Sequence, residues 1–185
     1  MPVSLPREEG ARKGRAWLVW LAATALLAGL VHLGAVVGVP RGIMIVVKRV
    51  TAAVPARIIH SDAVTASSRL VVRPSPDLLY SLCWFDVSRR PLQVTAAVPG
   101  SYFSIAGYAA NTDNFFVIND REIGAPRVSL VLIREGTRHT PRGGERIVAS
   151  PTDEGVVLFR TLITDRAQLD RLRALQRQAD CRPLL

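Results

Sequence analysis

Polar side chains that could hold a ligand through hydrogen bonds gather between residues 86 and 120. Asp86 closes one run of apolar and aromatic residues, and Tyr102 opens another. Asn114, Asn119 and Asp120 bracket a third run. Carboxylate, amide and phenol groups at strand ends donate or accept hydrogen bonds. We take these five residues as the candidate binding site. The alternative interpretation is that they only satisfy turns and strand ends.

Carboxylates in the same region raise the alternative of an enzyme. If two of them met in space, they could act as an acid–base pair on a small, cell-wall-derived or lipid-derived substrate. The sequence has no G-x-S-x-G elbow and no glycine-rich phosphate loop. We therefore name no catalytic residue and favour binding over catalysis. The carboxylates concerned are Asp77, Asp86, Asp113, Asp120 and Glu122.

The histidines and cysteines do not follow a metal-binding pattern. His32, His60 and His139 are isolated from one another, and neither H-E-x-x-H nor C-x-x-C occurs. The oxygen-rich stretch 111–120 lacks the spacing and the glycine of an EF-hand loop. We predict neither a metal nor a cofactor.

Two cysteines, Cys83 and Cys181, are candidates for a disulfide bond. In an oxidising compartment they would pair and close a loop of about 98 residues, which would stabilise the fold by roughly 4–5 kcal/mol in the chain-entropy view. The alternative is two independent buried thiols, as in a cytoplasmic domain.

The stretch from Arg134 to Arg146 is rich in arginine. Thr140-Pro141 and Gly143-Gly144 within it favour a loop or a long hairpin over a helix. The loop could contact anionic headgroups or an acidic partner, and the alternative is a merely solvated loop.

An uncharged stretch near the N-terminus predicts the element that positions the whole chain. Residues 16–40 contain no Asp, Glu, Lys or Arg. As a helix they would extend roughly 36 Å, more than the hydrocarbon core of about 30 Å. Trp17 and Trp20 lie near one end, where interfacial aromatics are common. We predict a transmembrane signal anchor; the alternatives are a cleaved signal peptide and a buried core helix. We interpret His32, inside the span, as neutral, with a functional or helix-contact role as the alternative.

Basic residues on both sides of this span predict its orientation. The cluster before the span lies closer to it than the cluster after it, so we expect residues 1–15 to form a cytoplasmic basic tail and the C-terminal domain to lie outside. Residues 41–68 are predicted to form a membrane-proximal stem, either a short surface helix broken near Pro55 or a plain linker. The two clusters are Arg7, Arg12, Lys13 and Arg15, and then Arg41, Lys48, Arg49 and Arg57.

Residues 69–185 are predicted to form an extracytoplasmic β-rich domain, a β-sandwich or jelly-roll-like sheet pair. Apolar and β-branched runs separated by turn residues indicate seven strands. Residues 165–179 predict a C-terminal amphipathic helix, with Leu169, Leu172 and Leu175 on one face and Thr164 as its cap. The strands are expected near 80–87, 92–98, 102–108, 114–118, 127–133, 146–149 and 155–162.

The formal charge of +9 does not indicate a nucleic-acid binder. Residues 1–50 carry seven Lys or Arg against two Glu, whereas residues 51–185 carry seventeen Arg against thirteen acidic residues. Over half of the net charge therefore flanks the predicted span, where anionic lipid is the natural partner. We expect the lipid bilayer, and no nucleic acid, as a partner.

Several phrases in the chain resemble one bacterial family of predicted integral membrane proteins, the domain of unknown function family 1254, in its short membrane-anchored branch. The resemblance implies a β-rich envelope domain behind a single N-terminal helix and a companion membrane protein from a similarly uncharacterised family. It implies no reaction. The five candidate binding residues, Asp86, Tyr102, Asn114, Asn119 and Asp120, are chosen because polar positions like those of the family cluster there. With the anchor, we expect an inner-membrane protein with a cytoplasmic N-terminus and a periplasmic domain that binds or scaffolds. The phrases are PDLLY (76–80), CWFDVS (83–88), YFS (102–104), DNFF (113–116), NDR (119–121), GVVLFR (155–160) and the closing Cys181.

Overall fold

The computed structural model describes residues 8–51, 54–65, 67–68 and 74–184. The chain divides into two compact units, residues 1–39 and 40–185. The first seven residues of the predicted basic tail and the predicted boundary at residue 69 lie outside the described residues.

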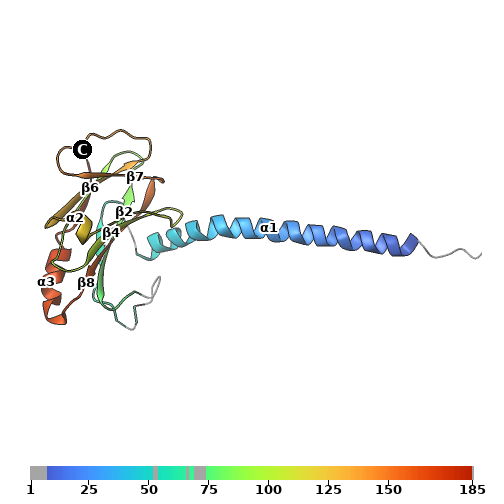
Figure 1. Cartoon of the computed structure of the whole chain (residues 1–185), viewed down its shortest axis with the longest axis horizontal. Helices are drawn as coiled ribbons and strands as arrows, with labels where there is room; N and C mark the ends of the chain where they lie inside the picture. Colours follow the sequence, from blue (N-terminus) through green and yellow to red (C-terminus); the bar gives the residue numbers. More distant parts are fainter. Residues whose placement is uncertain (1–7, 52–53, 66, 69–73, 185) are drawn as a thin grey trace, which may run out of the picture. The chain divides into compact units, whose positions relative to one another are not determined.

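The helix α1 (Glu8–Val50) is longer than the sequence predicts (Figure 1). It contains the whole uncharged stretch 16–40 and continues through Pro40 and Arg41 to Val50. Among the described residues, one helix is long and apolar enough to cross a membrane, by length and composition. The helix continues past Pro40 into the apolar run 43–47, although proline lacks a backbone N–H and its ring crowds the carbonyl four residues earlier. The sequence predicts a helix that ends near Pro40, followed by a short second helix or a linker. The structure instead has one continuous helix as far as Val50.

The second unit is built mainly from two β-sheets, which confirms the mainly β prediction (Figure 1). Neighbouring strands run antiparallel in both sheets, except that β6 and β7 pair in parallel. The first sheet, in spatial order, contains β1 (Ile58–His60), β2 (Leu78–Asp86), β8 (Glu154–Leu162), β4 (Phe103–Ala109) and β5 (Asn114–Asn119). The second contains β7 (Arg146–Ser150), β6 (Arg127–Arg134), β3 (Leu92–Ala97) and β9 (Asp180–Pro183).

The alternation of apolar and polar residues decides which side chains enter the core. In β3, Leu92, Val94 and Ala96 are buried, whereas Gln93 and Thr95 remain half-buried on the other face. Successive side chains of a strand point to opposite faces, so these three apolar residues of β3 reach one core. The largest fully buried side chains include Phe85, Leu79, Leu92, Ile105, Leu130, Leu132, Val94, Val131 and Val157.

Two of the shortest strands, β1 and β9, are absent from the predicted set, and both lie at sheet edges. Their sequences, Ile-Ile-His and Asp-Cys-Arg-Pro, are too short to show a period of two. They are strands because longer neighbours, β2 and β3, offer them backbone partners.

The C-terminal helix α3 (Leu169–Gln176) is shorter than predicted, and a 3₁₀ turn at Arg166–Gln168 precedes it. The predicted cap is wrong. The Asp165 side chain, and not Thr164, accepts a hydrogen bond from the Ala167 N–H. Leu172 is buried, in line with the predicted leucine face.

Candidate functional site

The structure separates the five candidate residues along the first sheet. Tyr102 precedes β4, and Asn119 and Asp120 lie where β5 ends and α2 (Asp120–Ile123) begins, so these three share one end of the sheet. Asp86 and Asn114 lie at the opposite end, because Asp86 is paired with Glu154 at the start of β8 and Asn114 begins β5. The five residues therefore do not line one common site. Their role in binding stays a prediction.

At the sheet end that carries Tyr102, Asn119 and Asp120, all three candidate side chains form hydrogen bonds within the domain. Asn119 caps α2, with its Oδ1 accepting from the Arg121 and Glu122 N–H groups at 3.0 and 3.2 Å. The Asp120 carboxylate accepts from the Phe103 N–H at 3.3 Å and so ties α2 to β4. The Tyr102 hydroxyl donates to Ser104 Oγ at 3.2 Å.

Asp86 and Asn114 are also engaged locally. Asn114 Nδ2 donates to the Gly107 and Phe116 carbonyls at 3.0 and 3.1 Å, at the irregularity where β4 and β5 shift register. Asp86 accepts from the Ser88 N–H at 2.9 Å. Hydrogen bonds from the side chain and backbone of Ser88 hold the pKa of Asp86 below its ordinary value, with a smaller contribution from Lys48. This carboxyl is therefore held in its ionised form.

A cluster that the sequence analysis did not assign lies where the C-terminal end of α1 packs on the first sheet. Met44 is buried against Trp84 and Val156, which lie on neighbouring strands. Lys48 Nζ lies 2.6 Å from Glu154 Oε2 and 5.0 Å from the centroid of the Trp84 ring. Trp84 Nε1 donates to the same carboxylate oxygen at 3.3 Å. The last turns of α1 are thus part of the folded domain.

One serine–histidine pair was missed because its members are 21 residues apart. His60 Nδ1 and Ser81 Oγ lie 2.9 Å apart, across the β1–β2 pairing. Burial, with a contribution from Arg177, lowers the pKa of His60, so the ring is neutral near pH 7. Ser81 is 2% exposed, which leaves its hydroxyl inaccessible to a substrate. The pair satisfies a buried hydroxyl rather than forming an open nucleophilic site.

Carboxylates do not converge in the described pockets. A pocket of about 200 Å³ beside α2 and β6 includes Glu122 in its lining. This carboxylate accepts from Asn119 Nδ2 at 2.8 Å and lies 3.8 Å from Arg146 Nη1. Within the described part of the chain, no group of three His, Cys, Asp or Glu residues could hold a metal ion.

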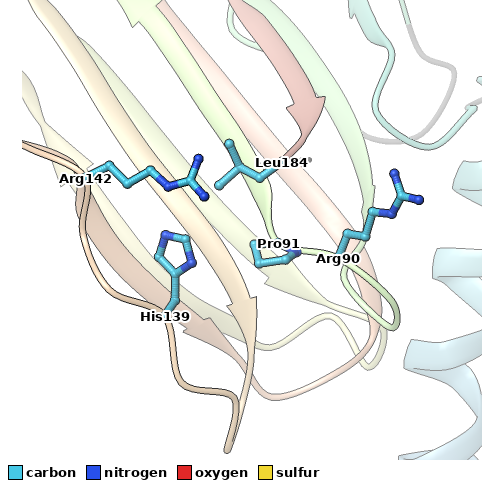
Figure 2. A pocket seen from close by; sticks show the side chains of 5 residues that line it. All are labelled: Arg90, Pro91, His139, Arg142 and Leu184. Carbon is cyan, nitrogen blue, oxygen red and sulfur yellow. The ribbon is translucent and has the colours of Figure 1, made fainter.

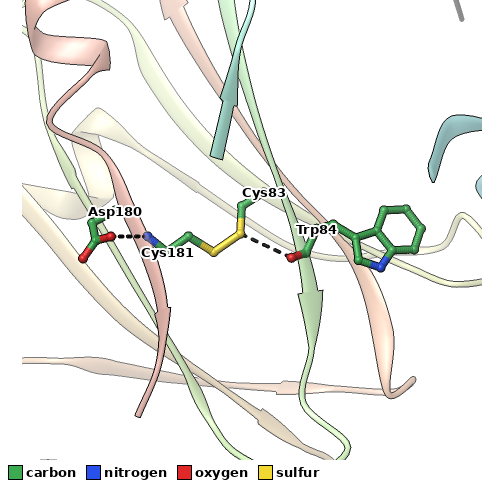
Figure 3. The surroundings of a disulfide bond; sticks show 4 residues. All are labelled: Cys83, Trp84, Asp180 and Cys181. Carbon is green, nitrogen blue, oxygen red and sulfur yellow. Dashed lines mark hydrogen bonds between the residues drawn. A yellow bond between two sulfur atoms is a disulfide. The ribbon is translucent and has the colours of Figure 1, made fainter. Parts of the chain in front are cut away.

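A disulfide bond between Cys83 and Cys181 joins β2 of the first sheet to β9 of the second (Figure 3). The two Cα atoms are 6.6 Å apart, and both residues are buried. The Asp180 carboxylate accepts a hydrogen bond from the Cys181 N–H at 2.9 Å. The bond fixes the C-terminal strand to the core and confirms the paired alternative of the sequence analysis.

The comparisons with known proteins agree with this architecture. The family described as "Protein of unknown function (DUF1254)" matches residues 55–183, which is most of the chain. The chain belongs to this family. The match covers the nine strands that the structure describes and the disulfide of this DUF1254 domain. No curated protein matches the chain.

Two crystal structures are similar to this DUF1254 protein. The VPA0106 protein from Vibrio parahaemolyticus is 15% identical with a TM-score of 0.53, over 60% of this chain and 28% of that one. A putative uncharacterized protein from Burkholderia cenocepacia is 18% identical with a TM-score of 0.49, over 78% of this chain and 39% of that one. The Vibrio structure supports the fold. This chain corresponds to well under half the length of either protein.

The residues that sequence reasoning missed had only weak signals. The sequence analysis counted Lys48 as a flanking charge and Trp84 as a strand residue. No local pattern shows that the end of α1 packs against β2. Their proximity depends on contacts between segments far apart in the chain, and Lys48 and Glu154 are separated by 106 positions.

Proposed function

We propose that this DUF1254 protein is a single-pass membrane protein whose β-sandwich lies outside the cytoplasm and works by binding, as an envelope interaction or scaffolding module. The Cys83–Cys181 disulfide in the core carries this proposal. Such bonds persist in oxidising compartments, whereas cytosolic thiols are kept reduced. The proposed location is the bacterial inner membrane, with the domain in the periplasm.

The helix α1 supports the role of a retained anchor. Its residues 16–39 are exposed along their whole length, including Trp17 and Trp20, which a lipid environment would cover. Further along α1, Met44 and Val47 are buried in the second unit. Because the end of the helix belongs to the domain, the apolar segment connects directly to a packed element. The basic residues before the span support a cytoplasmic N-terminus.

The placement of the carboxylates favours binding over the alternative of an envelope enzyme. Asp86 and Asp120 lie at opposite ends of the first sheet, where they accept backbone hydrogen bonds. An acid–base pair requires two carboxyls near one substrate and commonly one raised pKa. The pKa of Asp86 is instead lowered.

The surface that we propose for partner binding is the outer edge of β5. This strand is the last of the first sheet in spatial order, and β4 is its neighbour among the described strands. Val117 in β5 is 46% exposed. An edge strand offers unpaired backbone groups to an extended segment of another chain. The proposed partner is the companion membrane protein that the family resemblance implies.

Topology mapping in a bacterial host tests the location. A periplasm-active reporter fused after residue 185 should be active, and the two cysteines should react with a maleimide only after denaturation and reduction. As a control, the same reporter fused after residue 15 should be inactive. A cytoplasmic signal at residue 185 together with two free thiols would refute both the location and the disulfide in the cell.

Site-specific cross-linking tests the binding role. A photoreactive amino acid at Val117 should cross-link a membrane protein in intact cells. The matched control is Ala149, which is exposed on the edge strand of the second sheet. Equal products at both positions, or none at Val117, would argue against binding at the β5 edge.

A further inference from the structure

A basic hollow lies at one end of the second sheet and is lined in part by the arginine-rich stretch 134–146. It has a volume of about 480 Å³. Figure 2 shows Arg142 reaching toward Leu184 with the His139 ring beside it, and Arg90 on the other side of Pro91. These five residues come from the start of β3, the β6–β7 connection and the segment after β9. Three distant parts of the chain therefore form its walls.

Hydrogen bonds centred on Glu145 hold the wall made by the β6–β7 connection. The Glu145 carboxylate accepts from the Arg142 N–H at 2.8 Å, and its Oε1 lies 3.4 Å from His139 Nε2. Gly143 and Gly144 adopt positive φ angles of 126° and 66°, which let the chain turn back between these groups. The side chains of His139 and Glu145 are only 13% and 8% exposed. The connection is therefore ordered around a nearly buried carboxylate.

The state of Glu145 supports this arrangement. The backbone hydrogen bond from Arg142, and a smaller contribution from the hydrogen bond with His139, lower the pKa of Glu145. The carboxylate is thus ionised near neutral pH, and its hydrogen bonds go to groups of the same loop.

Backbone pairing fixes the opposite wall. The Leu184 N–H donates to the Pro91 carbonyl at 2.8 Å, directly beyond the pairing of Leu92 with Pro183. The disulfide at Cys181 attaches the same segment to the core. The shape of the hollow therefore does not depend on a ligand.

The two arginines at the hollow form no ion pair among the described residues, whereas His139 lies against the Glu145 carboxylate. In the described part of the chain, neither Arg90 nor Arg142 has a carboxylate within 4.0 Å of its guanidinium nitrogens. Other arginines on the same unit are paired, among them Arg134 with Asp153 and Arg182 with Asp180. The Arg142 guanidinium, with the His139 ring beside it, suits an anion, and a guanidinium fork matches the oxygen spacing of a phosphate (Figure 2).

We propose that this hollow is a binding site for a phosphate group, held by Arg142 with His139 beside it, while Arg90 adds positive charge from the other side of Pro91. Pro91 and Leu184 provide an apolar surface for the part of the ligand that carries the phosphate. The phosphate belongs either to a soluble phosphate ester or to a lipid headgroup, because both present non-bridging phosphoryl oxygens to a guanidinium group. The inference rests on the proposed binding function and gives that function a ligand class.

The test uses the full chain in a neutral detergent and inorganic phosphate as the probe, measured by titration calorimetry. Arg142→Gln combined with Arg90→Gln should weaken phosphate binding at least tenfold, because a charge-assisted hydrogen bond contributes about 1.5–3 kcal/mol and about 1.4 kcal/mol is a tenfold change. The matched control is Arg138→Gln, an exposed arginine of the same connection that does not line the hollow. It should bind phosphate like the wild type.

Two results would overturn the proposal. One is the absence of phosphate binding by wild-type protein whose near-ultraviolet circular dichroism shows a folded domain. The other is an equal loss of binding in Arg138→Gln, which would show a general response to positive charge. The double variant must keep the wild-type circular dichroism, so that a loss of binding reports the missing cations and not a loss of fold.

Reconstitution into nanodiscs distinguishes the two sources of phosphate. If phosphatidylglycerol in a phosphatidylcholine disc abolishes the response to inorganic phosphate, the site binds a headgroup. If the response is unchanged, the site binds a soluble phosphate; each result supports the site and names its source. If the wild-type protein binds no phosphate but still shows periplasmic topology and the Val117 cross-link, the phosphate site is refuted and the proposed function stands. A cytoplasmic domain would refute the proposed function.

Discussion

Removing the disulfide should cost this domain a large part of its stability. Cys83 and Cys181 are 98 positions apart, and both are buried. In the chain-entropy view, a cross-link closing a loop of that length stabilises the folded state by about 4.7 kcal/mol, because it restricts the unfolded chain. Domains of this size are typically stable by only about 5–15 kcal/mol. The double variant Cys83→Ala/Cys181→Ala is therefore expected to be marginally stable.

Urea denaturation of the full chain in neutral detergent measures this effect. With a slope of about 2 kcal/mol per molar urea, the midpoint should fall by about 2 M. Trp84 is a suitable probe, since it adjoins Cys83 and is 2% exposed, whereas Trp17 and Trp20 are 64% and 73% exposed on α1. A reductant should lower the wild-type midpoint to that of the double variant and leave the variant unchanged.

Two outcomes would refute this reasoning. If the double variant unfolded at the wild-type midpoint, the cross-link would not restrict the unfolded state as argued. If reductant destabilised the double variant as much as the wild type, the effect would not come from this bond. Cys83→Ala alone should behave like the double variant, because one cysteine cannot form the cross-link.

Three further changes have expected outcomes, all measurable by the same denaturation. Met44→Ala should lower the free energy of unfolding by about 2 kcal/mol through lost packing, whereas Ile45→Ala, at a position 53% exposed, should change it by less than about 0.5 kcal/mol; equal effects would contradict the docking of the helix end. Gly155→Ala should lower the free energy of unfolding by about 1–3 kcal/mol through overpacking, because a Cβ there would meet the Tyr108 carbonyl oxygen; a wild-type midpoint would show that the strands can separate. Since the folded-state pKa of Glu145 lies below its ordinary value of 4.5, its contribution should be complete above pH 4.5 and lost as the pH falls through the folded-state pKa. Glu145→Gln should therefore flatten the acid limb of the stability curve, and an unchanged limb would show that the loop carboxylate is not involved.

Much of the β-structure was predictable because its signal is local. The alternation in β3 and the apolar runs of β2 and β8 each lie within nine residues or fewer, so one stretch of sequence contains the whole pattern. The missed strands β1 and β9 have only three and four residues. Their conformation depends on the strands beside them, which no local pattern records.

The functional residues were harder to predict because their groupings are not local. The candidate residues Asp86 and Asp120 carry chemistry suited to binding, but strand directions place them at opposite ends of the sheet. Arg142 was recognised only as one member of a basic stretch. Its neighbours in the hollow, Arg90 and Leu184, come from the start of β3 and the segment after β9.

The sequence by itself determined that an uncharged helix long enough for a membrane precedes a mainly β domain. Both conclusions follow from the order of apolar and charged residues, which acts over one helix or strand at a time. Only the tertiary structure decided that Cys83 and Cys181 are joined, that Lys48 reaches Glu154, and which arginines share a hollow. These groupings bring together residues from about 50 to more than 100 positions apart in the chain, and the cooperative packing of two sheets, rather than local preference, places them near one another.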